Sequence, residues 1–187
     1  MSRAGMSALI QRVRSLTYAG TAEYTLGTAA FWDDDQIEQV LDRHRVEIFR
    51  ERLGREPSYP GGGSVVYKIH FSSYGNLEAG TALFIEDSVG DNRGTADYSV
   101  DYQTGRIDFS ADQAGTTLYM TARSYDPFGA AAEVLESWAA SEARQFDFAT
   151  DGQSFQRRQK AEGLREQARL LRKRARVQSR RLRTGGR

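Results

Sequence analysis

Residues 124–146 read SYDPFGAAAEVLESWAASEARQF, and they mark the point where the chain changes from strand to helix. Asp126 is a good helix N-cap, and Pro127 suits the first position of a helix. From there apolar residues return every three or four positions, which predicts an amphipathic helix. The residues before this stretch alternate with a period of two, which is typical of strands. We therefore expect helices and strands in separate parts of the chain.

The strand pattern begins after the linker REPSYPGGGS, residues 55–64, and continues to about residue 124. Residues 97–110, DYSVDYQTGRIDFS, predict a β-hairpin whose turn lies at 103–105. Leu118, Met120 and Ala122 predict a last strand. Several short strands with regular turns predict a small antiparallel sandwich or barrel.

Helical patterns lie on both sides of this β block. Residues 4–16 carry apolar positions three to four apart, and residues 34–44 do the same after Asp33, an N-cap with Gln36 in a capping box. His44 shares the apolar face of that second helix. A last helix opens at Gly152 or Ser154. The order predicts an α+β fold, in which two helical hairpins form a four-helix bundle and a β-sandwich or barrel is inserted between them.

The predicted boundaries follow from these patterns. They are 1–54 for the N-terminal helical hairpin, 55–124 for the inserted β domain, 125–178 for the C-terminal hairpin and 179–187 for a disordered basic tail.

The composition excludes several classes of protein. There is no cysteine, which excludes disulfides and thiol chemistry, and no apolar run of about 18 residues, so no membrane span is expected. This composition fits a cytosolic product or a virion protein assembled in the cytosol.

Charge is divided unevenly along the chain. Residues 1–156 hold 13 Lys and Arg against 23 Asp and Glu, a net charge of −10, whereas residues 157–187 hold 13 against 2, a net charge of +11. Such a division indicates an acidic partner, which could be nucleic acid, an acidic protein or an anionic membrane. A solvated helix face is the alternative, but it explains poorly why glutamate is nearly absent.

The last helix combines two features. Small residues and leucine share one stripe, which predicts close packing against another helix or subunit. The stripe consists of Ala161, Leu164, Ala168, Leu171 and Ala175. Basic residues fill the other faces and the tail, and we take the following as candidate contacts to a protein partner or DNA: Arg172, Lys173, Arg174, Arg176, Arg180, Arg181, Arg183 and Arg187.

No motif for chemistry stands out, so we expect no enzyme, no cofactor and no metal site. His44 and His70 are each isolated in sequence, and His70 is expected on the polar face of a strand. Residues 86–94, EDSVGDNRG, offer oxygen ligands for calcium without the spacing of an EF-hand, which favours a polar turn.

Aromatic residues of the β block allow two interpretations. Tyr98, Tyr102, Phe109 and Tyr119 could stack nucleic-acid bases. Because they lie on the alternating faces of predicted strands, packing in the core is the favoured interpretation.

Three stretches together resemble the head–tail connector (adaptor) proteins of tailed bacteriophages. They are residues 31–44, FWDDDQIEQVLDRH, the hairpin 97–110, and residues 125–175, in which AAAEVLESWA is followed by the corner TDGQSFQRRQ and a basic helix. The resemblance covers about residues 30–45 and 97–176. It implies a connector-type helical subunit of the virion neck.

The resemblance also implies partners. About twelve copies would form a ring below the portal protein, extend the channel for double-stranded DNA and receive the next neck, stopper or tail protein. The basic helix and tail would dock on the portal or line the channel, with assembly in the host cytoplasm and no membrane partner. The β block and the basic tail are both larger than a minimal adaptor needs. Two alternatives remain open: a non-sequence-specific nucleic-acid-binding protein, and another neck or tail-completion protein.

Overall fold

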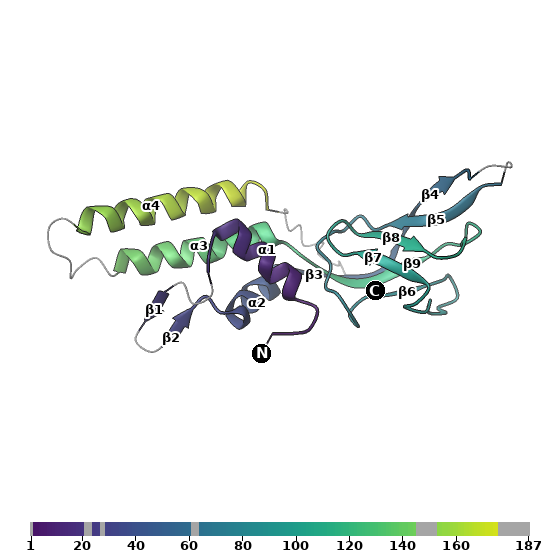
Figure 1. The fold of residues 1–187 in the computed structure, drawn as a ribbon, viewed down its shortest axis with the longest axis horizontal. Helices are drawn as coiled ribbons and strands as arrows, with labels where there is room; N and C mark the ends of the chain where they lie inside the picture. The colour runs from purple at the N-terminus through teal and green to yellow at the C-terminus, as the bar shows by residue number, and fades with distance from the viewer. Residues whose placement is uncertain (1, 21–23, 27–28, 61–63, 145–152, 176–187) are drawn as a thin grey trace, which may run out of the picture.

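The computed structural model describes residues 2–20, 24–26, 29–60, 64–144 and 153–175. The molecule is elongated, with four helices at one end and two antiparallel sheets at the other (Figure 1). The helices are α1 (Ser7–Thr17), α2 (Asp34–Arg43), α3 (Pro127–Arg144) and α4 (Gln153–Arg172). A short hairpin of β1 (Tyr24–Leu26) and β2 (Ala29–Phe31) joins α1 to α2.

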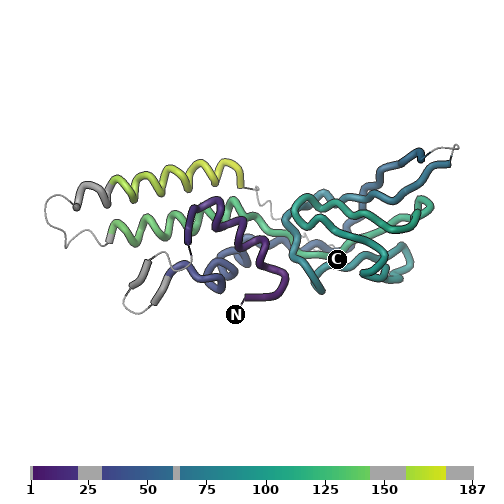
Figure 2. The backbone as a smooth tube through the Cα atoms, in the orientation of Figure 1, coloured from purple at the N-terminus to yellow at the C-terminus, as the bar shows by residue number. Residues whose placement is uncertain are grey.

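The two sheets are formed by residues 45–125. The first has the order β3-β9-β6, with β3 at Arg45–Arg52, β9 at Tyr119–Tyr125 and β6 at Phe84–Glu86. The second has the order β4-β5-β8-β7, with β4 at Gly54–Ser58, β5 at Val66–Phe71, β8 at Arg106–Phe109 and β7 at Tyr98–Asp101. The backbone path in Figure 2 shows that β3 leaves the helices and that β9 returns to them.

Each end of the molecule has its own apolar core. Residues of all four helices form one, including Ile10, Leu41 and Leu135, and residues of both sheets form the other, including Ile85, Ile107 and Met120. The paired strands β3 and β9 connect them. At the junction the backbone N–H of Asp126 donates to the carbonyl of His44, so α2 ends where α3 begins.

Local sequence signals are confirmed. Asp33 accepts a hydrogen bond from the backbone N–H of Gln36, and the Gln36 side chain accepts one in return from Asp33, which completes the capping box. Asp126 accepts from the N–H groups of Phe128 and Gly129 at the start of α3. The hairpin of β7 and β8 turns at Gly105, whose φ of +78° favours glycine.

The predicted four-helix bundle is wrong, although the inserted antiparallel strands fit the expectation. α1 and α2 have only 11 and 10 residues, about 15 Å each, whereas α3 and α4 have 18 and 20. The short helices cannot run along the whole α3–α4 hairpin, and they pack on α3 instead. The chain after α2 continues as a strand, since β3 begins at Arg45, and the predicted boundary at residue 55 falls within β4.

Candidate functional site

The apolar stripe of α4 lies against α3 of the same chain. Ala161, Leu164, Ala168 and Leu171 are buried, and Ala175 is partly exposed. Leu164, Ala168 and Leu171 belong to the core shared by the four helices. The stripe predicted for close packing is therefore covered within the subunit.

Two cations of α4 are neutralised by glutamates of α3. Arg172 donates to Glu136 from Nε at 2.7 Å, and the Nζ of Lys160 lies 2.8 Å from the Oε1 of Glu142. The hydrogen bond from Arg172 lowers the pKa of Glu136 and, in turn, raises the pKa of Arg172. Lys160 also lies over the ring of Trp138, 4.9 Å from its centroid. These two ion pairs link α4 to α3, and each cation keeps about half of its side chain exposed.

Arg165 and Arg169 of α4, together with Lys173 directly after its last residue, face outwards. Arg165, Arg169 and Lys173 are exposed and follow one another at four-residue spacing, so they lie on one side of the helix. Arg169 has a side chain 73% exposed and only a 3.9 Å contact with Glu166. Within residues 159–175 and the rest of the described chain, no carboxylate pairs with Arg165 or Lys173. This basic face can bind an acidic surface, either protein carboxylates or phosphates.

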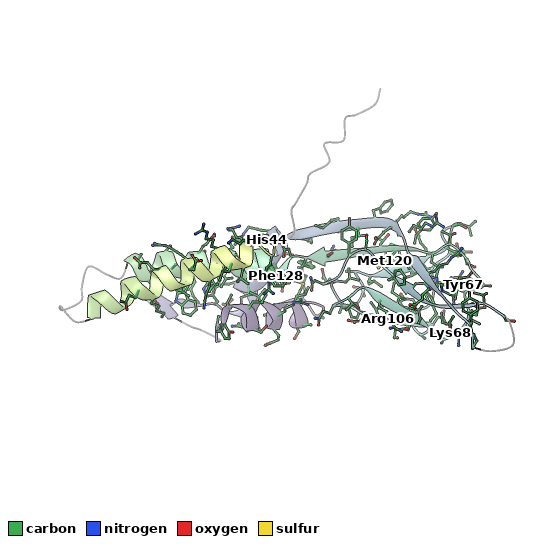
Figure 3. All side chains as sticks on the ribbon, turned by 90° about the horizontal axis from the view of Figure 1, so that it is seen from above. His44, Tyr67, Lys68, Arg106, Met120 and Phe128 are labelled. Carbon is green, nitrogen blue, oxygen red and sulfur yellow. The ribbon has the colours of Figure 1, made fainter. Side chains whose placement is uncertain are left out.

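A second pair of arginines meets at the junction of the two ends. The guanidinium of Arg174 lies 5.6 Å from the centroid of the Phe128 ring, and that of Arg12, on α1, lies 5.9 Å from the same centroid. Figure 3 shows Phe128 beside the end of α4, where helices meet strands. Arg176, Arg180, Arg181, Arg183 and Arg187 lie outside the described residues.

The two histidines have structural surroundings. His44 ends α2, and its Nε2 lies 2.9 Å from Glu133. Burial opposes ionisation of Glu133, but the hydrogen bonds from Arg43 and His44 lower its pKa overall. His70 is buried beside Phe109 rather than on a polar face, so that expectation was wrong.

The calcium candidate and the aromatic candidate also have structural explanations. Asp87 accepts hydrogen bonds from the N–H groups of Val89, Gly90 and Asp91, which makes residues 86–94 a polar turn. Phe109 is buried in the β core, and Tyr98 and Tyr102 pack against that core. Among the described residues, no three His, Asp or Glu side chains form a metal-binding cluster.

The basic helix was evident in the sequence, but the sequence did not show which of its cations pair with α3 and which face outwards. The paired set depends on Glu136 and Glu142, whose spacing along α3 was visible in the sequence but whose partners were not. Arg12 was missed altogether, because a single arginine on an amphipathic helix gives no signal.

Comparison with models of known protein families, with characterised proteins and with solved structures gave no match. In the described part of the chain, no helix is both long enough and apolar enough to cross a membrane.

Proposed function

We propose that this chain is a structural protein of a bacteriophage virion, a head–tail connector that forms a ring below the portal, surrounds the DNA channel and receives the next neck or tail protein. The observation that carries the proposal is the outward basic face at the end of α4, formed by Arg165, Arg169 and the adjoining Lys173. It supplies unneutralised positive charge on a helix that is otherwise fixed to α3, which suits docking on an acidic protein surface.

The shape of the subunit supports the same function. Its helices and sheets form separate cores at two ends of an elongated molecule, so the two ends can bind different partners (Figure 1). Residues 157–187 carry a net charge of +11, and the described residues among them belong to the helical end or lie next to it. A subunit that joins two structures needs two such distinct surfaces.

Co-sedimentation tests this function. The full chain, a truncation without residues 176–187, and a variant with Arg165, Arg169 and Lys173 changed to alanine are each mixed with portal-bearing, DNA-filled heads and, separately, with free duplex DNA. A connector sediments with heads at low and high salt. Absence from the heads at both salt concentrations contradicts the connector function.

Nucleic-acid binding is the second candidate, because the same outward cations also fit phosphates. Binding of this kind falls steeply with salt and lacks sequence preference. Retention on free duplex at low salt, with loss at high salt and no binding to heads, is the result that favours it.

A further inference from the structure

A groove of about 510 Å³ lies between α1 and two loops of the β part. α1 contributes Leu9, Arg12 and Ser15 to its lining, and the β part contributes Leu77 and Tyr102. Leu9 and Leu77 give it an apolar floor. No carboxylate is among the described residues that line it, so nothing in the lining offsets the charge of Arg12.

A second arginine lies close to Arg12. Arg12 shares the ring of Phe128 with Arg174, and neither guanidinium has an ion-pair partner among the described residues. The groove thus suits a segment that brings an apolar side chain and a carboxylate.

The turn after β6 offers such a segment. Val89 is 82% exposed, and Asp91 is exposed beside it. The Oδ1 of Asp87 accepts from the N–H groups of Val89, Gly90 and Asp91 at 3.0, 3.1 and 3.1 Å, which fixes the turn before any partner binds. Because the turn is already ordered, docking it costs little conformational entropy.

The turn and the groove of one chain lie too far apart to meet. Glu86, which precedes the turn, pairs with Tyr119 at one end of β9, and Leu77, in the groove, forms a bridge with Ser124 near the other end. Five positions along a strand span about 17 Å. A contact between turn and groove must therefore join two copies, and since the two surfaces differ, the contact is heterologous.

We propose that the turn of residues 87–91 in one copy docks in the α1 groove of a second copy. Val89 covers Leu9 and Leu77, and the carboxylate of Asp91 pairs with Arg12. Repetition of this contact gives a ring if its rotation closes. The inference deepens the proposed connector function by naming the surfaces that join neighbouring subunits.

Cysteine cross-linking tests the contact directly, because the chain has no cysteine of its own. Val89→Cys protein is mixed with Ser15→Cys protein under mild oxidation, and the yield of the mixed disulfide dimer is measured. Lys68→Cys replaces Val89→Cys in the control, since Lys68 is exposed at the far end of the β part (Figure 3). The expected result is a yield several-fold above that of the control pair.

Charge reversal then separates the contact from random collision. Arg12→Glu in the Ser15→Cys chain should lower the yield, and Asp91→Lys in the Val89→Cys chain should restore it. Equal yields for the two cysteine pairs, or an excess that Arg12→Glu leaves unchanged, overturn the proposal. Head binding is measured separately by co-sedimentation. Failure of the contact between copies therefore does not by itself contradict the connector function.

Discussion

The imidazole of His70 packs edge-on against the ring of Phe109, with their centroids 5.2 Å apart, and neither of its nitrogens has a hydrogen-bond partner in the described chain. Desolvation lowers the pKa of His70 below its ordinary value of 6.5, although the backbone of Lys68 opposes the shift. An unpaired polar ring in a β core costs free energy. His70 thus lowers the stability of the β part.

This arrangement predicts acid sensitivity. Below about pH 6.5 the unfolded chain binds a proton at His70 that the folded chain rejects, so the free energy of unfolding falls as the pH drops towards the lower pKa of the folded state. His70→Leu should remove that contribution and stabilise the fold by about 1–3 kcal/mol at neutral pH. Urea denaturation of both proteins from pH 8 to pH 5 measures the free energy of unfolding at each pH. If it falls equally in the two proteins as the pH drops, His70 is not the source of the acid sensitivity.

The guanidinium of Arg14 predicts a larger loss elsewhere. It is almost fully buried and donates to the carbonyl of Trp32 at 3.0 Å and to Asp34 at 2.6 Å, which holds the chain before α2 against α1. Arg14→Met should lower the free energy of unfolding by about 1–3 kcal/mol, because it leaves the buried carbonyl of Trp32 without a donor.

Arg106→Met is the matched control for Arg14. Arg106 pairs with Asp108, and both side chains are largely exposed. Solvent screens such an exposed pair, so it contributes little to the free energy of unfolding. Thermal denaturation should therefore show a clearly lower melting temperature for Arg14→Met than for Arg106→Met. A similar decrease in both would contradict the stabilising role assigned to the buried Arg14.

Arg3 ties the chain's beginning to the junction of the two ends. Its Nε lies 2.8 Å from Glu38 and its Nη2 lies 2.6 Å from Asp42, both on α2. Nearby, the hydroxyl of Tyr125 donates to the buried Glu78 at 2.6 Å. Burial, together with this hydrogen bond, raises the pKa of Tyr125 well above its ordinary value, so the tyrosine stays neutral.

Arg3→Ala should loosen the junction, because Glu78 loses a nearby cation and α2 loses its link to the N-terminal segment. Amide hydrogen exchange at residues 78–79 and 125–126 should become faster, while exchange in α4 stays unchanged. Arg45→Ala serves as the control, since its main partner is the exposed Glu47. Unchanged exchange at the junction in Arg3→Ala would contradict the role assigned to Arg3.

Local signals predicted the elements better than their arrangement. Asp33 with Gln36, and Asp126 with Pro127, act within one turn of a helix, so neighbouring residues suffice to predict them. The strand β3 was missed because only Ile48 of its eight residues is buried, so its alternation is weak. The predicted lengths of the first two helices were close to those of α1 and α2, but their packing on α3 depends on contacts between residues far apart in sequence.

The candidate site shows the same limit. The basic helix was evident from composition, yet the pairing of Arg172 with Glu136 depends on the register between α3 and α4, and the meeting of Arg12 with Arg174 depends on the position of α1. Contacts between residues far apart in sequence leave no local pattern. His70 was misplaced for a related reason, because its core is shared by two sheets.

The outward cations of α4 should control docking without controlling stability. Changing Arg165, Arg169 and Lys173 together to alanine removes three exposed charges, each able to contribute up to about 1 kcal/mol to a contact with an acidic surface. Affinity for portal-bearing heads should therefore fall by about tenfold or more, while the melting temperature changes little.

Lys160→Ala is the control with the opposite expectation, because Lys160 pairs with Glu142 and lies over the ring of Trp138 within the subunit. It should lower the melting temperature and leave head binding intact. Titration of heads with each labelled protein gives the affinities, and equal head affinity for the triple variant and the unaltered chain would exclude this face of α4 as the docking surface.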